Sequence, residues 1–228
     1  MLAWLKRNGR RLLLWTALLA VGLPVALTVV YRFVPPPVTP LMLLRRLDGE
    51  GLDQRWVPLD AIAADLPRAV IAAEDAKFCT HHGFDWDAID NAIDRYEDGG
   101  HMLGASTISM QTAKNVFLWP GRNFLRKGVE AGLTVLIETL WGKRRIIEVY
   151  LNVIEWGHGI YGAEAAARHY FGKPASALTR REAAALAAVL PSPRRWSPIR
   201  PGGHVAARIR IIAARMGQVS PSPERVCR

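Results

Sequence analysis

Cysteine is scarce in this chain of 228 residues, which contains only Cys79 and Cys227. Two cysteines do not make the disulfide framework of a small secreted domain, and their separation does not match metal-ligand spacing. The sequence leaves a bridge between them open and does not support one. Histidines at helical spacing are lacking too, because His81 and His82 are adjacent and His158 stands alone. A metal site built by the protein is therefore not expected.

Charge is absent from Leu12 to Tyr31, a run of 20 residues. A helix of that length spans about 30 Å, which is the thickness of the hydrocarbon core of a bilayer. The apolar region of a cleaved signal peptide is shorter and ends in small residues, whereas this run leads into Val34-Pro35-Pro36-Pro37. We therefore expect an uncleaved transmembrane anchor over residues 12–34.

Acidic residues are missing from the first 34 positions, which carry five basic ones. Lys6, Arg7, Arg10 and Arg11 precede the apolar run and only Arg32 follows closely, so the positive-inside rule puts residues 1–11 in the cytoplasm. Subtracting these five from the net charge of +10 leaves +5 for the exported part. Nucleic acid is not an expected partner there; anionic lipid headgroups or a phosphate-bearing substrate are better candidates, and a basic surface without a ligand is the alternative.

Alternating strand patterns and internal repeats are also lacking, and the fold class that we expect is all-α. Residues 35–54 are predicted to be a proline-rich connector that keeps the following domain near the membrane. A buried helix is expected over Leu66–Ala73 with Pro67 in its first turn, and another between Asp85 and Gly99. Further helices are expected over Ser106–Leu118, Asn123–Trp141, Lys143–Leu151, Gly162–Tyr170, Thr179–Val189 (with a capping box) and His204–Met216.

The first candidate site is the carboxylate pair Glu74 and Asp75, which ends the apolar run from Leu66 to Ala73. A glutamate that is partly desolvated there has a raised pKa and suits general-base catalysis. The ordinary alternative is a helix end whose acids meet solvent.

The second and third candidate segments carry cations. Gly104 to Asn115 is a glycine-containing loop leading into a helix, with Ser106 as the expected N-cap, and could hold a phosphate. On that helix Thr107, Gln111 and Lys114 share one face, although such a face is often plain solvent exposure. Farther along, Arg122 follows a Trp-Pro-Gly turn, and Arg126 and Lys127 lie within one turn of Glu130. A surface salt bridge, worth about 0.3–0.5 kcal/mol, is the commoner use of that spacing.

A fourth segment, Lys143 to Asn152, is followed by a glycine-rich turn around His158. Together the four segments resemble the bacterial peptidoglycan glycosyltransferase family, the glycan-polymerising module of class A penicillin-binding proteins, and most closely its monofunctional, membrane-anchored members. The shared motifs are Glu-Asp-x-x-Phe-x-x-His-x-Gly at 74–83, Gly-x-Ser-Thr-Ile at 104–108, Arg-Lys-x-x-Glu at 126–130 and Lys-x-x-Ile-x-Glu-x-Tyr-Leu-Asn at 143–152. One departure is Met110, where the family usually has the first of two glutamines; it either packs inward or loosens substrate contacts.

The resemblance implies a lysozyme-like domain over residues 55–216, with a smaller membrane-associated lobe, a tail over 217–228 and no penicillin-binding Ser-x-x-Lys domain. The exposed apolar residues Leu41, Met42, Leu43 and Leu44 would dip into the membrane surface. The implied location is the bacterial cytoplasmic (inner) membrane, crossed once, with the catalytic domain on the periplasmic side. The implied partners are lipid II, the nascent glycan, the bilayer, and other cell-wall synthesis and division proteins.

The implied reaction transfers a glycan on a polyprenyl pyrophosphate to the 4-hydroxyl of lipid II, a lipid-linked disaccharide-pentapeptide, with inversion and release of polyprenyl diphosphate. The implied catalytic residues are Glu74 and Glu130; the substrate- and pyrophosphate-binding residues are Asp75, Phe78, Ser106, Thr107, Gln111, Lys114, Arg122, Arg126 and Lys127. No cofactor is required, and Glu130 would orient these cations or the substrate, or hold a divalent ion, Mg²⁺ or Mn²⁺, on the diphosphate. A hydrolytic or lytic enzyme of the same polymer and a non-catalytic lipid II-binding scaffold are the alternatives.

Overall fold

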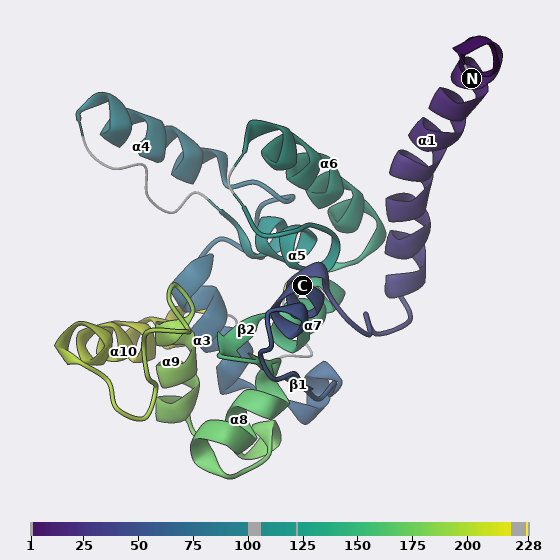
Figure 1. Cartoon of the computed structure of the whole chain (residues 1–228). Coiled ribbons are helices and arrows are strands. Elements are labelled where there is room, and N and C mark those ends of the chain that lie inside the picture. Colours follow the sequence, from purple (N-terminus) through teal and green to yellow (C-terminus); the bar gives the residue numbers. More distant parts are fainter. Residues whose placement is uncertain (1, 100–105, 122, 220–226, 228) are drawn as a thin grey trace.

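The computed structural model describes residues 2–99, 106–121, 123–219 and 227, and helices dominate it (Figure 1). The all-α prediction is confirmed, and the last six predicted helices agree with the observed bounds within two residues at each end. The helices are α1 Leu2–Tyr31, α2 Pro40–Leu47, α3 Asp65–Glu74, α4 Trp86–Glu97, α5 Ile108–Phe117, α6 Phe124–Leu140, α7 Lys143–Val153, α8 Ala163–Phe171, α9 Arg180–Val189 and α10 Gly203–Arg215; short 3-10 turns lie at Leu59–Ala61, Ala175–Ala177 and Met216–Gln218.

A small three-stranded sheet, which the sequence did not indicate, joins the connector to the domain. Its strands are β1 Asp53–Gln54, β2 Glu155–Gly157 and β3 Ile160–Tyr161, in the order β1-β3-β2. β1 is parallel to β3, and β2 is antiparallel to it. Gly159 makes the approach of β1 possible, because a Cβ there would lie 2.4 Å from the carbonyl oxygen of Gly51. Strands of two or three residues are too short to show an alternating pattern.

The helices form two groups that meet at the end of α3. Figure 1 shows α4, α5 and α6 on one side and α3, α8, α9 and α10 on the other. In the second group α9 packs against both α3 and α10, and every residue from Ala183 to Val189 is buried. Five of these seven residues are alanines, and so small a side chain lets three helices approach one another closely. This packing brings α10 beside Glu74, the last residue of α3.

The N-terminal helix is fixed to the domain at its C-terminal end. The indole N–H of Trp141 donates to the carbonyl oxygen of Thr28 at 2.7 Å, and Arg145 donates to the carbonyl oxygens of Tyr31 and Val34 at 2.8 and 2.9 Å. Among the described residues, α1 is the one helix long and apolar enough to cross a membrane, over Leu14–Tyr31. An apolar helix in this place fits a single-pass membrane anchor.

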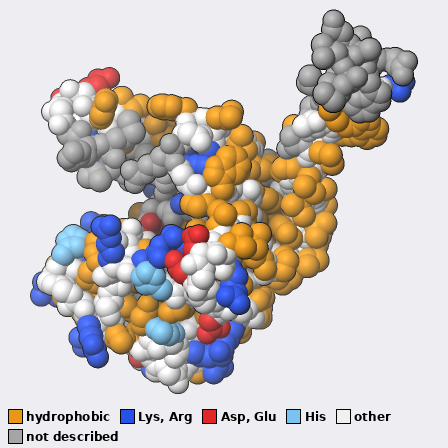
Figure 2. Space-filling model, viewed as in Figure 1, with side chains coloured by type: hydrophobic (Ala, Val, Ile, Leu, Met, Phe, Trp, Pro, Cys, Tyr) orange, Lys and Arg blue, Asp and Glu red, His pale blue; other side chains and the backbone are white. Residues whose placement is uncertain are grey.

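Hydrophobic side chains cover the surface next to α1, as Figure 2 shows. Leu43 and Leu47 of α2 are exposed, and Phe124 and Leu125 at the start of α6 are 98% and 80% exposed. The expectation for Met42 was wrong: it is fully buried, and its sulfur accepts the backbone N–H of Thr39 in the capping box of α2. Because α2 is amphipathic, Leu43, Leu44 and Leu47 face out where Met42 faces in, and Leu41, also expected to be exposed, is half-buried against the core.

A disulfide joins Cys79 to Cys227 across a sequence separation of 148 residues. Cys79 lies in the segment that follows Glu74, so the C-terminal end of the chain is tied to the neighbourhood of the first motif. A crosslink over so long a loop removes conformational entropy from the unfolded chain.

We predict that replacing both cysteines with serine lowers the free energy of unfolding by about 2–4 kcal/mol. The measurement is thermal unfolding of the detergent-solubilised protein followed by circular dichroism. Reductant should lower the melting temperature of the wild type and leave that of the double variant unchanged. A wild-type protein that melts at the same temperature with and without reductant would contradict the prediction.

Candidate active site

Glu74 lies at the C-terminal end of α3 and is held by two other helices. Its Oε2 accepts a hydrogen bond from the Gln111 side chain of α5 at 3.2 Å, and its Oε1 lies 3.1 Å from the Arg208 guanidinium of α10. Burial raises the pKa of Glu74, and the Gln111 hydrogen bond and the charges of Arg208 and Lys114 oppose that rise. The net pKa is raised, as the sequence predicted. The carboxylate remains a hydrogen-bond acceptor with a higher proton affinity than an ordinary glutamate.

Asp75 is turned away from this contact and fixes the surrounding backbone. Both of its oxygens lie 3.0 Å from Nε2 of His81, and Oδ2 accepts the backbone N–H of Ile108, the first residue of α5, at 2.9 Å. Nδ1 of His81 accepts the N–H of Gly83. The neutral ring therefore carries its proton on Nε2, facing Asp75. The predicted carboxylate pair thus divides into Glu74, which contacts side chains of α5 and α10, and Asp75, which joins the end of α3 to the start of α5.

Phe78, Gly83 and Thr107 of the first two motifs fix the segment that follows Glu74. Phe78 is fully buried, and the ammonium of Lys143 lies 4.6 Å from the centroid of its ring. Thr107 donates to the carbonyl oxygen of Gly83 at 2.6 Å. Gly83 has a φ of +94°, and a Cβ there would lie 3.0 Å from Thr134, so glycine is required on both counts.

Two of the four segments also meet through polar side chains. Lys143 donates to Glu138 at 2.6 Å, and Ser109 of α5 donates to the same carboxylate oxygen. At the other end of the fourth motif, Asn152 bonds the backbone of Val57 and Glu148 accepts the N–H of Leu59. The fourth motif therefore holds the fold together around the site.

The N-cap of α5 differs from the prediction. Thr107, and not Ser106, accepts the N–H of Met110 at 3.1 Å and caps the helix. Both residues are hydroxyl-bearing and stand in adjacent positions, so the spacing alone does not separate them. Ser106 is exposed and lines a cavity of about 220 Å³ that also contains Glu74, Asp75 and Asp85.

The predicted polar face of α5 is present and has two parts. Gln111 bridges the site, because it donates to Glu74 and accepts the hydroxyl of Tyr150 at 3.1 Å. Burial raises the pKa of Tyr150 well above its ordinary value, so its hydroxyl stays a donor. Met110 is buried, which settles the departure from the family pattern in favour of inward packing. Lys114, one turn farther along, faces a different cavity.

This second cavity has a volume of about 450 Å³ and is rich in cations. Lys114, Arg126 and Arg45 of α2 line it, together with Glu155. Burial lowers the pKa of Lys114, and Glu130 opposes that shift. The Lys114 ammonium forms no hydrogen bond or ion pair with any residue that the structure describes. Arg126 is 7% exposed, and its Nε has no hydrogen-bond partner among those residues. The cavity therefore offers buried positive charge to an anion.

Glu130 sets the position of the cations beside this cavity. It is almost completely buried and forms ion pairs with Arg126 at 2.8 Å and with Lys127 at 2.6 Å. This confirms the predicted contact of two cations with one carboxylate. Within the described part of the chain, no group of three or more His, Cys, Asp or Glu side chains is placed to hold a metal ion.

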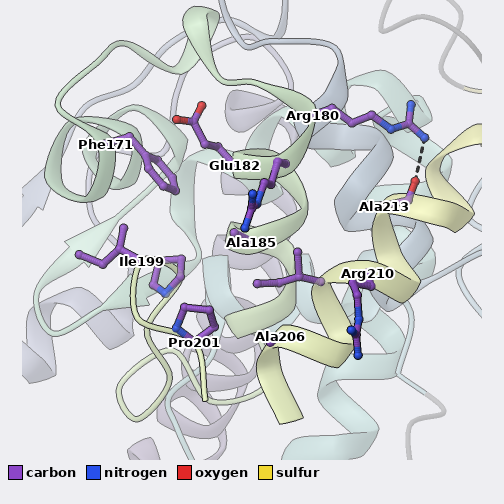
Figure 3. Close-up of a pocket in the computed structure, with 12 residues that line it drawn as sticks. Phe171, Arg180, Glu182, Ala185, Ile199, Pro201, Ala206, Arg210 and Ala213 are labelled. Atoms are coloured by element: carbon purple, nitrogen blue, oxygen red, sulfur yellow. Dashed lines mark hydrogen bonds between the residues drawn. The ribbon is translucent and has the colours of Figure 1, made fainter. Parts of the chain in front are cut away.

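A wider cavity of about 860 Å³ lies elsewhere, between α9, α10 and the segment Pro198–Pro201 (Figure 3). Its walls are largely apolar, and Arg180 and Arg210 stand at its edge. None of the predicted site residues lines it. Size alone therefore does not identify the active site, whereas the two smaller cavities contain the carboxylate and the cations.

Sequence reasoning missed several residues of the site. Arg208 carries no local motif, and Arg45 stands within the expected connector. His81 and Lys143 belong to the quoted motifs, so the sequence could have indicated them as site residues. The predicted residue Arg122, with Gly104 of the second motif, lies outside the described residues.

Comparison with known proteins identifies the family. The family model described as transglycosylase matches residues 42–217. A biosynthetic peptidoglycan transglycosylase of Caulobacter vibrioides is 57% identical, over 95% of this chain and 94% of the relative. One from Rhodospirillum centenum is 62% identical over 86% and 85%, and one from Pseudomonas fluorescens strain Pf0-1 is 51% identical over 96% and 92%.

The fold and the site define a helical, lysozyme-like glycosyltransferase domain that follows an apolar N-terminal helix. The chain belongs to the transglycosylase family, and its activity is that of a peptidoglycan glycosyltransferase in cell-wall synthesis.

We predict that Arg208→Gln raises the pKa of the Glu74 carboxyl, because the variant loses a cation that favours the ionised form. The wild-type pKa should lie above the ordinary value of 4.5. A carbon-13 NMR titration of glutamate carboxyl groups measures both. The acid limb of the pH–activity profile should move upward with it. Arg210→Gln, on another face of α10, is the control, and an unchanged Glu74 pKa in Arg208→Gln would contradict the prediction.

A second prediction concerns the buried cation cluster. Glu130→Gln should cost about 3–5 kcal/mol of folding free energy, because Arg126 remains buried without its counter-charge. Lys127→Ala should cost at most about 1 kcal/mol, because Lys127 is nearly half exposed. Denaturant unfolding of the two variants compares these costs. Equal losses would show that burial of Arg126 is not what makes Glu130 necessary.

Proposed function

We propose that this enzyme polymerises peptidoglycan strands by transferring a glycan from a polyprenyl pyrophosphate to the 4-hydroxyl of lipid II, with inversion at the sugar carbon. The observation that carries the proposal is that one helix, α5, contacts the carboxylate Glu74 and also lines the cation-rich cavity. On α5, Gln111 contacts the buried carboxylate Glu74, and Lys114 lines the cation-rich cavity one turn away. A base for the attacking hydroxyl and a cationic site for the departing diphosphate are the two requirements of this reaction.

Glu74 would act as the general base. A sugar hydroxyl has a pKa far above neutrality, so its proton must be removed as the new bond forms. Burial gives Glu74 a raised proton affinity, and Gln111 and Arg208 fix the direction of its oxygens. The cavity of about 220 Å³ that contains Glu74 and Ser106 provides the approach for the hydroxyl.

Lys114 and Arg126 would stabilise the pyrophosphate as it leaves. Negative charge accumulates on the departing oxygens in the transition state, so fixed cations favour the transition state over the bound substrate. Lys114 forms no ion pair or hydrogen bond with any described residue, and the Nε of Arg126 has no partner among them, so both can donate to a bound diphosphate. Glu130 holds Arg126 and Lys127 in place.

The described residues do not supply a metal site. Both oxygens of Glu130 contact cations, and the described residues contain no other suitable cluster. In this proposal a divalent ion is not required. Diphosphate oxygens of the substrate are themselves ligands for Mg²⁺ or Mn²⁺.

The cytoplasmic membrane, with the catalytic domain on its periplasmic side, is the proposed location. The apolar α1 helix and the exposed leucines and Phe124 beside it support contact with lipid. The disulfide between Cys79 and Cys227 supports an oxidising compartment, because such bridges are rare in the cytosol. A substrate whose lipid tail stays in the bilayer would then reach the cation cavity beside α2.

We predict that Glu74→Gln lowers kcat by about 10²–10⁴-fold, because glutamine keeps the size of the side chain and one acceptor oxygen but cannot take up the proton of the attacking hydroxyl. The assay is polymerisation of labelled lipid II in detergent, with products checked for cleavage by a muramidase. Glu97→Gln, at an exposed position on α4, is the matched control.

The same assay distinguishes the alternatives. Cleavage of existing glycan without polymer formation would identify a hydrolytic or lytic enzyme. Binding of lipid II without turnover by the folded wild type would identify a scaffold. Full activity of Glu74→Gln would leave the transferase in place and remove Glu74 as its base.

A further inference from the structure

A third cavity, of about 260 Å³, lies between α3 and α10, next to the cavity that contains Glu74. Ala72, Ala73 and Arg215 line both this cavity and the one that contains Glu74. The two spaces are therefore neighbours that meet at Arg215. Neither the proposed base nor the proposed pyrophosphate site uses the third cavity.

The charged side chains of this cavity are all basic. His204, Arg208 and Arg215 lie four and then seven residues apart, on one face of α10. Arg208 is paired with Glu74, and the ring of His204 packs against that of Trp196. Arg215 is exposed and has no hydrogen bond or ion pair with any described residue. Within the part of the chain that the structure describes, one cation next to the base therefore has no paired carboxylate.

Acidic groups nearby are already engaged. Asp85, in the neighbouring cavity, accepts the N–H of Ala88 as the N-cap of α4 and lies 3.6 Å from Lys77. Asp75 is held by His81 and by the backbone of Ile108. Neither carboxylate forms an ion pair with Arg215, so among the described residues the arginine is left accessible to a carboxylate of a ligand.

The walls of the cavity are made of small or aliphatic side chains. Ala72 and Ala73 of α3 face Ala207, Ile211 and Ile212 of α10. Such walls suit a narrow, partly apolar ligand, and the cations at the edge suit carboxylates. Figure 1 places α10 at the end of the molecule away from α1, so a lipid headgroup is not the expected occupant.

We propose that the groove between α3 and α10 binds the peptide of the acceptor substrate, with Arg215 as the cation that pairs with a peptide carboxylate. This inference rests on the proposed function, in which the acceptor is a lipid-linked disaccharide that carries a pentapeptide. When its 4-hydroxyl is at Glu74, the peptide on the same molecule lies within reach of the adjoining groove. The pyrophosphate occupies the other side of α5, beside Lys114 and Arg126, and does not compete for Arg215.

The test compares two acceptors with the same labelled lipid-linked glycan as donor. One acceptor carries the pentapeptide with free carboxylates, and the other carries the same peptide with its carboxylates amidated. The quantity measured is kcat/KM of the full-length enzyme in detergent. Wild type should prefer the free acid by about three- to fivefold, which is the size expected for an exposed ion pair. Arg215→Ala should lose this preference through a higher KM for the free acid, with kcat nearly unchanged.

Two further variants complete the design. Arg215→Lys keeps the charge and should keep part of the preference. Arg210→Ala removes an arginine from the same helix at the edge of the separate cavity in Figure 3, and should keep all of it.

The possible results separate the peptide site from the proposed reaction. Equal kcat/KM for both acceptors in wild type would overturn the peptide site and leave the glycosyltransferase reaction intact. An Arg215→Ala variant that keeps the preference, or that loses the same factor with both acceptors, would also overturn it. A folded wild type that uses neither acceptor would overturn the proposed reaction, and the peptide site with it.

Discussion

The hydrogen bonds of Asp75 are the constraint on which the geometry of the site depends. This buried carboxylate receives the N–H of Ile108 at the start of α5 and a ring N–H of His81. A carboxylate at a helix N-terminus is favoured both by the unpaired backbone donors and by the helix dipole. The contact fixes the end of α3 against the beginning of α5. Asp75 is adjacent to Glu74, and Ile108 lies one turn before Gln111, so this contact also brings Glu74 and Gln111 together.

The distribution of charge around α5 follows from that junction. On one side Glu74 is a carboxylate whose burial is offset by a neutral amide and by the charges of two cations, Arg208 and Lys114. On the other side Glu130 pairs with Arg126, and its charge favours the ionised form of Lys114, which itself forms no hydrogen bond or ion pair with any described residue. Burying charges costs free energy unless they are paired, so an incompletely neutralised cluster of this kind is better suited to a bound anion than to stability alone. α1 and α2 place the cluster near the apolar surface.

Much of this arrangement could be predicted from the sequence. The helices follow from apolar periodicity and from caps such as Thr179 with Glu182. The pairing of Arg126 and Lys127 with Glu130 follows from helical spacing, and the raised pKa of Glu74 follows from its apolar neighbours. These signals are local, because each depends on residues within a few turns of one another.

The remaining features depend on contacts between distant parts of the chain. Arg208 reaches Glu74 across 134 residues, and the disulfide joins positions 148 residues apart. Neither pairing leaves a periodic trace in the sequence. The sheet was missed because strands of two or three residues are too short to show an alternating pattern. The choice of Thr107 over Ser106 as the cap of α5 depends on the carbonyl of Gly83, which only the folded loop brings into reach.

The disulfide has a practical consequence for handling the protein. It makes residues 79–227 a closed covalent ring that contains α4 to α10, while α1, α2 and α3 lie outside it. A single cut of the backbone within the ring leaves both pieces attached until the bridge is reduced, so fragments separate only on a reducing gel. Anything appended after Arg228 begins next to Cys227, and hence beside the loop that follows Glu74. Affinity tags and fluorescent fusions therefore belong at the other end of the chain.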